Sequence, residues 1–155
     1  MIDIDLLEKY EAVRKLYKKT EIIFEKDHLA THYYQIVSGA VKMNNFNDEG
    51  REFIQGIFYK DQSFGEPPLF LNRTYPANAE ATEDAELLCI SKENFLKLMF
   101  ENPSVSIKII EILALKFESI STKHSVEFLS KSQRVWSKSK NKCFIKRLLI
   151  SLQVC

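Results

Sequence analysis

The sequence predicts a mainly β domain, an antiparallel sandwich or barrel, with flanking helices. Turn signals recur about every 8–12 residues through the first half of the chain, as in all-β sandwiches and barrels. Short runs between these turns alternate apolar and polar residues, which is typical of strands. From Ser91 onward the spacing of apolar residues becomes helical, so helices follow the β region.

The first segments are expected to form a short amphipathic helix and then strands. Apolar side chains recur about every three positions at the N-terminus: Ile4, Leu7, Tyr10 and Val13. Farther along, "YYQIVSGAVKMNNF" contains two strand-like runs separated by a Ser-Gly pair, which indicates a tight turn at Gly39.

The next strands are predicted by their turns. The "NDEG" at 47–50 indicates a hairpin, because Asn, Asp and Gly tolerate the positive φ of such turns. "REFIQGIFY" alternates from Phe53 onward, and "AEATEDAELLCI" supplies two further short strands.

A helix is expected to begin after Ser91, which suits the N-cap. Glu93 lies in its first turn, where a negative charge favours the helix dipole. We expect Asn102-Pro103 to end it. Its apolar stripe is predicted to be Phe95, Leu96 and Met99.

A longer helix is predicted from Pro103 to at least Ser121, with two apolar faces. One face, which suits packing on the β region, contains Val105, Ile109 and Ile112. The other has the 3-4-3 spacing of a coiled-coil seam, which indicates dimerisation, and contains Ile110, Leu113, Phe117 and Ile120. The alternative is a helix buried on both sides in a monomer.

Composition indicates a globular, reduced protein. The chain has 155 residues, 45% of them apolar, and three widely spaced cysteines without a Cys-x-x-Cys pair. The acidic N-terminus and the lack of a long apolar run predict a cytoplasmic protein with no membrane partner. Residues 131–155 carry seven Lys or Arg and no Asp or Glu, which indicates a basic tail, either solvated or in contact with nucleic acid.

Enzyme motifs are absent from the sequence, and we predict no catalytic residues. There is no Gly-x-Ser-x-Gly, Walker loop or Gly-x-Gly-x-x-Gly. His28 and His32 have helical ligand spacing but lie in a segment that reads as a loop entering a strand, so no metal site is predicted. Cys89 is interpreted as a buried strand residue.

The segment "FGEPPLFLNRTYPANAEA" at 64–81 combines a glycine, a carboxylate and two prolines. Gly65 permits a close backbone approach, and Pro67 and Pro68 favour the first turn of a helix. A helical turn up to Leu71 would direct free N–H groups inward, as in an anion site. The alternative is a tight corner packed by apolar side chains: Phe64, Leu69 and Phe70.

Residues from about Leu16 to Asn102 resemble the cyclic-nucleotide-binding domain of the Crp–Fnr bacterial transcription regulators. The resemblance rests on "YYQIVSGAVKM", "FGE", "NAEA" and "LLCISKENFLKLMFENP", and it implies an antiparallel β jelly roll, a double-stranded β-helix. The helix from Pro103 is similar to the family's dimerisation helix. Thr20 and Asp27 stand where the family often has glycine, so altered turns are expected there.

The resemblance implies that 64–81 is the family's phosphate-binding cassette for a cyclic AMP-like ligand. Phe64, Gly65 and Glu66 match the ribose-binding part, where a carboxylate accepts a hydrogen bond from the 2′-hydroxyl. The family's arginine and the small residue after it hold the cyclic phosphate. Aligning Ala77 and Ala81 with the family's alanines places Tyr75 and Pro76 at those two positions, with Arg73 two residues early.

The remaining chain is too short for the winged helix-turn-helix that usually follows in this family. We therefore expect a β-roll with its N-terminal helix at 1–102, a dimerisation helix at 103–130 and a basic tail at 131–155. A truncation or frame shift near 125–140 would explain the missing domain. DNA would be a partner only if a helix-turn-helix exists in the full-length product.

The predicted function is an effector-sensing, dimerising domain of a Crp–Fnr-type regulator with an altered pocket. The expected pocket residues are Phe64, Gly65, Glu66, Tyr75, Pro76 and Ala77. Its partners would be a small-molecule effector and a second copy of the chain. The alternative is a stand-alone protein-interaction module in which Tyr75 fills a ligand-free pocket.

Overall fold

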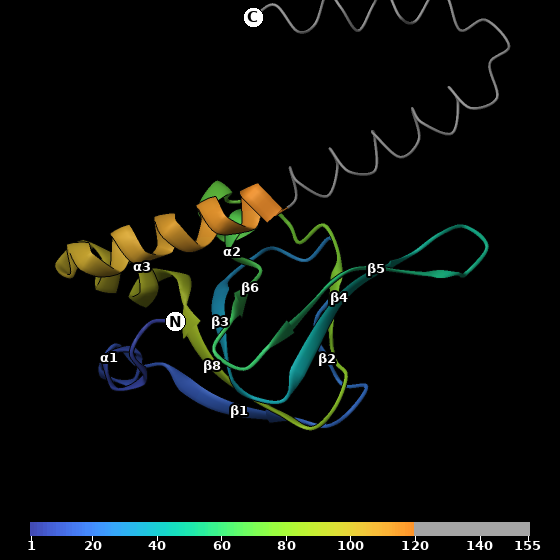
Figure 1. The fold of residues 1–155 in the computed structure, drawn as a ribbon, viewed down its shortest axis with the longest axis horizontal. Helices are drawn as coiled ribbons and strands as arrows, with labels where there is room; N and C mark the ends of the chain where they lie inside the picture. Colours follow the sequence, from blue (N-terminus) through green and yellow to red (C-terminus); the bar gives the residue numbers. More distant parts are fainter. Residues whose placement is uncertain (120–155) are drawn as a thin grey trace, which may run out of the picture. The chain divides into compact units, whose positions relative to one another are not determined.

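The computed structural model describes residues 1–119, and within them the chain forms two antiparallel sheets with helices around them (Figure 1). Met1–Lys108 forms one compact unit, and a second unit begins at Ile109. Eight strands lie within the described residues, so the predicted mainly β fold with flanking helices is confirmed.

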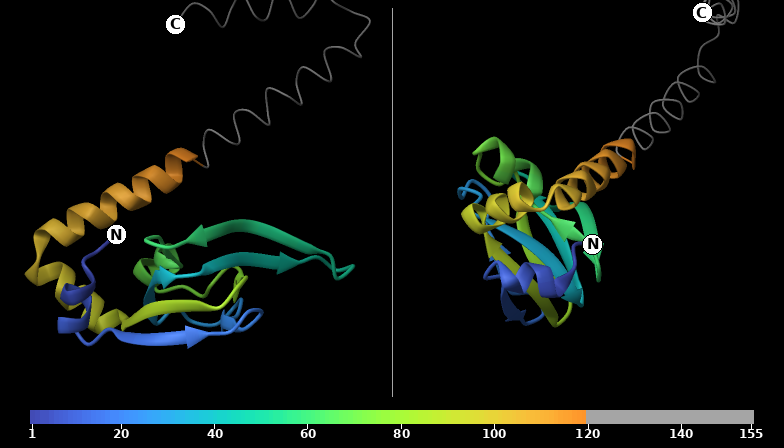
Figure 2. Two further views of the ribbon diagram at one scale, coloured as in Figure 1. Left: turned by 60° about the horizontal axis from the view of Figure 1, so that its bottom comes forward. Right: turned by 90° about the vertical axis from the view of Figure 1, so that its left-hand side faces the viewer.

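Each sheet has four strands, and neighbours within a sheet run antiparallel. The first has the order β1 (Val13–Tyr17), β8 (Ala85–Ser91), β3 (His32–Ser38) and β6 (Ser63–Phe64). The second has the order β2 (Ile22–Phe24), β7 (Asn78–Ala81), β4 (Ala40–Phe46) and β5 (Glu52–Tyr59). Strands distant in sequence are neighbours in both sheets, and the β4–β5 hairpin extends beyond the rest of the roll (Figure 2).

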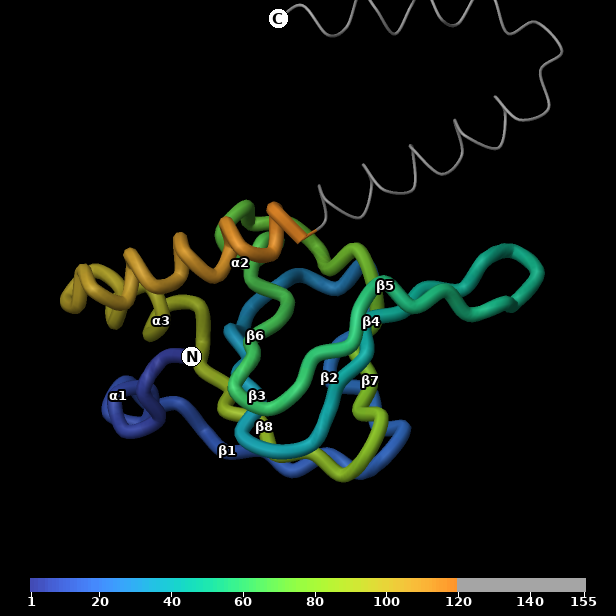
Figure 3. Tube along the Cα trace, in the orientation of Figure 1, coloured from blue at the N-terminus to red at the C-terminus, as the bar shows by residue number. Residues whose placement is uncertain are grey.

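Gly39 makes the sharp turn between β3 and β4, as the Ser-Gly pair predicts. Its φ is +81°, a conformation that side-chain-bearing residues rarely adopt. A Cβ at this position would lie 2.5 Å from the carbonyl oxygen of Asp84, in the turn before β8. The two turns therefore press together at one end of the roll (Figure 3), and only glycine fits between them.

Thr20 and Asp27 also adopt positive φ, of 71° and 67°. Both turns thus keep the left-handed conformation for which glycine is favoured, although neither residue is glycine. The Thr20 N–H donates to the carbonyl of Ala81 at 2.8 Å, and the Asp27 N–H donates to the carbonyl of Tyr75 at 2.9 Å. These two bonds tie the turns to the segment that carries the cassette.

The N-terminal helix α1 (Ile4–Lys9) confirms the predicted short helix, with Leu7 fully buried, but it ends before Val13, which is exposed and begins β1. Asp3 caps it by accepting a hydrogen bond from the N–H of Leu6 at 3.1 Å. Ile2, just before the helix, is held by the side chain of Gln35 in β3 through both its N–H, at 3.0 Å, and its carbonyl, at 2.9 Å. A buried glutamine thereby anchors the N-terminus.

Two adjacent tyrosines of β3 connect the helical layer with the roll. Because successive strand side chains point to opposite faces, Tyr33 and Tyr34 have different neighbours. Tyr33 stacks on Phe95 of α3 at 4.1 Å between ring centroids. Tyr34 stacks on Phe64 of β6 at 5.4 Å. One strand therefore supports α3 on one face and the cassette on the other.

Helix α3 (Lys92–Glu101) begins and ends as predicted, with Ser91 accepting a hydrogen bond from the N–H of Asn94 and Asn102 as the C-cap. The predicted stripe is partly wrong. Phe95 is buried, but Leu98 is buried with it and Leu96 is 41% exposed. Positions three apart share a helix face, whereas position 96 is turned about 100° away from 95.

The chain continues as a helix over residues 103–119. Val105 and Ile109 are buried. In the predicted seam, Ile110 is 64% and Phe117 is 74% exposed, and Leu113 is half-buried. Ile120, the remainder of 103–130 and the basic tail lie outside the described residues. None of the helices within residues 1–119 is long and apolar enough to cross a membrane.

Candidate functional site

The short helix α2 (Glu66–Leu71) forms the turn that the two prolines predict, with Gly65 as its N-cap. Gly65 has φ of +78°. A Cβ there would lie 3.2 Å from a ring carbon of Phe24 and 3.3 Å from a ring carbon of Tyr75. Glycine is thus needed for both the backbone conformation and the close approach of two aromatic rings.

Glu66 follows Gly65 in the first turn of α2 and is only 1% exposed. Its position favours a negative charge, because the N–H groups at a helix N-terminus carry partial positive charge. Burial, and to a smaller extent the charge of Glu66, raises the pKa of Tyr33. The carboxylate therefore lies inside the protein, close to the tyrosine that supports α3.

Tyr75, at the position predicted for the family's arginine, points inward and is 2% exposed. Its ring stacks on Phe24 with 3.6 Å between centroids and 9° between planes. Its N–H donates to the carbonyl of His28 at 2.9 Å, and its hydroxyl donates to the carbonyl of His32 at 3.4 Å. Both the backbone and the ring of Tyr75 are therefore fixed from the segment that leads into β3.

Around Tyr75 lies an aromatic cluster formed by Phe24, Tyr34, Phe58, Phe64 and Tyr75. Phe24 contacts Tyr34 at 5.6 Å and Phe64 at 5.9 Å between centroids. Burial raises the pKa of Tyr34 and of Tyr75, so both hydroxyls stay neutral at physiological pH. The cluster contains no cation, and rings occupy the space beside Gly65.

The other predicted site residues are split between the interior and the surface. Ala77 is fully buried, whereas Arg73 and Pro76 are exposed. The Arg73 N–H donates to the carbonyl of Pro68 at 3.0 Å, and the Pro76 carbonyl accepts from the side chain of Asn45 at 3.0 Å. The structure thus brings Phe64, Gly65 and Tyr75 together and leaves the guanidinium of Arg73 outside.

Sequence reasoning missed Phe24 and Tyr34 as parts of this site. Both sit in strands, and strand periodicity shows which face a side chain takes but not which distant ring it will meet. The available signal was the large number of aromatic residues near the cassette, in "EIIF" and "HYYQIV".

The two histidines near this region have different surroundings. His28 is in the loop, with its Nε2 3.5 Å from Oε2 of Glu25, and His32 begins β3. Burial, helped by nearby Lys15, lowers the pKa of His32. Cys89 is buried in β8, where burial raises the pKa of its thiol to about 11. Within residues 1–119, no three His, Cys, Asp or Glu side chains gather as a metal site would require.

A family model described as the cyclic nucleotide-binding domain matches residues 14–102. The chain belongs to the cyclic nucleotide-binding domain family. The match starts in β1 and ends at the C-cap of α3, so it covers both sheets and the cassette.

Two of the similar proteins are bacterial regulators, which confirms the resemblance to the Crp–Fnr group. The cyclic AMP receptor protein of Thermus thermophilus is 30% identical over 112 residues, 72% of this chain and 51% of that protein. The anaerobic regulatory protein of Bacillus subtilis is 27% identical over 120 residues, 77% of this chain and 50% of that protein. The chain spans about half the length of these relatives.

Among solved structures, the catabolite activator protein of Thermus thermophilus is 28% identical and superposes with a TM-score of 0.70. The superposition covers 82% of this chain and 58% of that chain. The predicted jelly roll followed by a helix is therefore confirmed.

Proposed function

We propose that this chain is the effector-sensing and dimerisation domain of a Crp–Fnr-type regulator, with a cassette that Tyr75 closes to cyclic nucleotides. The family membership supports the regulatory class, and the buried ring of Tyr75 supports the closed cassette. The single observation that carries the proposal is the stack of Tyr75 on Phe24 beside Gly65.

The electrostatics of the cassette argue against a bound cyclic phosphate. A cyclic phosphate is an anion, and placing it among buried rings without a counter-charge is costly. The guanidinium that would pair with it is replaced by a neutral phenol, and the nearby Arg73 is exposed. A charge-assisted hydrogen bond contributes ~1.5–3 kcal/mol, or roughly tenfold to more than a hundredfold in affinity.

Dimerisation is proposed through the helix that starts at 103. The exposed seam residues Ile110 and Phe117 are large apolar side chains at helical spacing, as at a helix–helix interface. In this proposal 1–102 senses, 103–130 dimerises and 131–155 is a basic tail. A change in the position of this helix relative to the partner's helix would transmit the signal. DNA binding would need a helix-turn-helix in a longer product.

A second candidate is a stand-alone protein-interaction module with a ligand-free cassette. The observation that favours it is the same ring stack, because a cassette filled by its own side chains stays folded without a ligand. In that case the exposed face of the helix at 103–119, and not the cassette, would carry the function.

Calorimetric titration with cyclic AMP and cyclic GMP tests the closed cassette. The natural chain should show no saturable heat, and Tyr75→Phe should behave identically because it keeps the ring. Tyr75→Arg restores the missing charge and should gain measurable affinity if the variant remains folded by circular dichroism. Saturable binding of either nucleotide to the natural chain would contradict the proposal.

The same preparations separate the two candidates through their oligomeric state. Sedimentation equilibrium should give a dimer for the natural chain and a monomer for Phe117→Glu, because a buried unpaired charge opposes the helix contact. Glu118→Gln is a neighbouring control that should stay dimeric. If the natural chain is a monomer, the dimerisation proposal is wrong and the protein-interaction module is the candidate that stands.

A further inference from the structure

Residues 2–11, which contain α1, are attached to the rest of the domain at both ends, and we call them the N-terminal strap. Ile2 at the first end is 1% exposed. Glu11 at the second end has a φ of 66°, which residues with a side chain rarely adopt. The strap belongs to the compact unit Met1–Lys108. It therefore connects two places of one compact unit.

Gln35 of β3 holds the first end of the strap and is itself fully buried. Its Nε2 donates to the carbonyl of Ile2 at 2.9 Å. Its Oε1 accepts from the N–H of Ile2 at 3.0 Å and from the hydroxyl of Tyr33 at 3.1 Å. Breaking such a set would leave buried polar atoms without partners, which is costly. The first end of the strap is thus firmly fixed.

The same glutamine lies beside the cassette. Gln35 is paired with Ser63 across the β3–β6 ladder, and Glu66 begins α2 three residues later. Tyr33 lies on the same face of β3 as Gln35, because strand side chains alternate between the two faces. Burial, and to a smaller extent the charge of Glu66, raises the pKa of Tyr33. The strap therefore shares its first anchor with the cassette.

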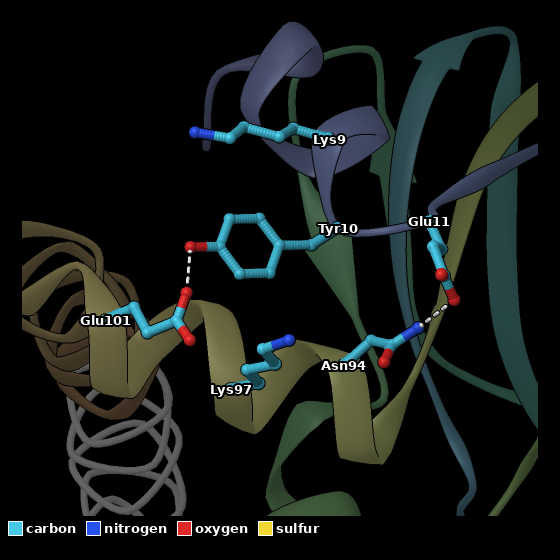
Figure 4. Close-up of a pocket in the computed structure, with 6 residues that line it drawn as sticks. All are labelled: Lys9, Tyr10, Glu11, Asn94, Lys97 and Glu101. Carbon is cyan, nitrogen blue, oxygen red and sulfur yellow. Dashed lines mark hydrogen bonds between the residues drawn. The ribbon is translucent and has the colours of Figure 1, made fainter.

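The second end of the strap is bound to α3 and to the residue that follows it. The Tyr10 hydroxyl donates to Oε2 of Glu101 at 2.6 Å and accepts from Nδ2 of Asn102 at 3.1 Å. The Asn94 side chain donates to Oε2 of Glu11 at 2.9 Å. Figure 4 shows the bonds to the two carboxylates crossing from the α1 side to α3. They span a cleft of about 250 Å³ between these helices.

Asn102 is the junction between α3 and the helix at 103–119. Its Nδ2 also donates to the carbonyl of Leu98 at 3.0 Å, and its own carbonyl accepts from the N–H of Val105 at 2.9 Å. One asparagine thus joins the strap, the end of α3 and the first turn of the next helix.

We propose that Gln35 is a positioning residue, which acts through the N-terminal strap on the start of the helix at 103–119. Packed side chains, hydrogen bonds and rigid elements carry coupling between distant sites, and the strap contains all three. Helix α1 is the rigid element between Ile2 and Tyr10, so a displacement of Ile2 would also displace Tyr10. A change in the cassette would thus reach the junction. The inference rests on the proposed function, in which this helix carries the signal.

Amide hydrogen exchange of the natural chain and of Gln35→Met tests this coupling. Met is flexible and fills space well, but it lacks the strong donors and acceptor of the amide. The amides of Asn102 and Val105 should exchange about two- to tenfold faster in the variant, which corresponds to one net hydrogen bond. The amide of Ala81, in the second sheet, should keep its natural rate. Unchanged exchange at the junction, or equal acceleration at Ala81, would overturn the proposal.

A double-mutant cycle shows whether the strap is the route. Tyr10→Phe removes both bonds of the hydroxyl at the second end and should itself speed exchange at the junction. Adding Gln35→Met to Tyr10→Phe should then cause little further acceleration, because the strap has already lost its bond to Asn102. A local packing role of Gln35 would give fully additive effects instead, and this result would contradict the proposed route.

Two further variants complete the test. Asn45→Ala removes a hydrogen bond from β4 to the carbonyl of Pro76 and is the control, which should leave exchange at the junction unchanged. An acceleration equal to that of Gln35→Met would sink the proposal. Gln35→Glu in its ionised form cannot donate to the carbonyl of Ile2, so it repeats the test if Gln35→Met does not fold. No nucleotide and no second copy enters the measurement, so its outcome is separate from that of the proposed function.

Discussion

The cassette and the α1–α3 cleft are opposite kinds of site in one small domain. The cassette at 64–81 has a left-handed Gly65 and a buried Glu66, and aromatic rings occupy the space beside them. The cleft between α1 and α3 has a volume of about 250 Å³ and is lined by polar and charged side chains, with two lysines and two glutamates among them (Figure 4). The difference teaches that a segment resembling a ligand cassette can be filled by its own rings while an open polar cleft lies elsewhere in the domain.

The comparison makes a general prediction about variants. Substitutions in the cassette should lower the stability of the fold. Substitutions at the cleft lysines Lys9 and Lys97 should leave stability nearly unchanged, because exposed charges contribute little to folding. The individual variants test both halves of this contrast, in order of expected effect.

Truncation of the central ring should have the largest effect. Tyr75→Ala removes a buried ring that stacks on Phe24, and buried aromatic-to-alanine changes cost about 3–5 kcal/mol. Urea denaturation of the two proteins measures the difference in the free energy of unfolding. Tyr75→Phe is the matched control and should lose less than about 1 kcal/mol, because its 3.4 Å hydroxyl contact is weak. Equal losses would show that the ring stack contributes nothing.

A methyl group at Gly65 should have the next largest effect. Gly65→Ala places a Cβ 3.2 Å from the Phe24 ring on a backbone with φ of +78°, so strain and crowding add to about 2–3 kcal/mol. Gly50→Ala is the control, since φ is +75° there but no atom lies within 4 Å. It should lose only the strain, about 1–2 kcal/mol. A loss for Gly50→Ala as large as that for Gly65→Ala would remove the crowding argument.

The loss of folding stability at alkaline pH should depend in part on the buried phenol of Tyr75. Burial raises the pKa of Tyr75 above its ordinary value, so the folded state holds this proton more tightly than the unfolded chain. The resulting stability is complete below about pH 10 and is lost as the pH rises through the folded-state pKa. Tyr75→Phe should therefore flatten the fall of melting temperature above pH 10. A fall of the same slope in the variant would contradict this assignment.

The smallest effect is expected at the cleft. Tyr10→Phe removes the exposed hydrogen bond to Glu101 and the partly buried one from Asn102. The melting temperature should fall less than in Gly65→Ala. A scanning calorimetry comparison of the two variants tests this order, and a larger fall for Tyr10→Phe would reverse the contrast between the two regions.

Local patterns were enough to predict much of the fold. The Ser-Gly turn at Gly39, the cap at Ser91 and the prolines of α2 act on neighbouring residues, so their effects can be read from short segments. Short segments could not predict which of Leu96 and Leu98 is buried on α3. It depends on which part of the helix meets Tyr33 through Phe95, and this is a tertiary contact.

The candidate site also combines features that a local motif predicts with features that depend on tertiary contacts. Gly65, Glu66 and the place of Tyr75 followed from the sequence because a local motif carries them. The stack of Tyr75 on Phe24 joins two segments that are far apart in the chain, and so does the cleft between Lys9 and Lys97. Periodicity gives the face of a side chain but not its distant partner, so both features needed the three-dimensional arrangement.

The most direct test of the closed cassette is a chemical-shift titration of the natural chain with cyclic AMP, observed at the Gly65 amide and at the Tyr75 ring. The two groups are close neighbours, because a Cβ at Gly65 would lie only 3.3 Å from a ring carbon of Tyr75. The account predicts that neither signal moves in a saturable way up to millimolar nucleotide. Saturable movement of both signals, with the Tyr75 ring leaving Phe24, would contradict it.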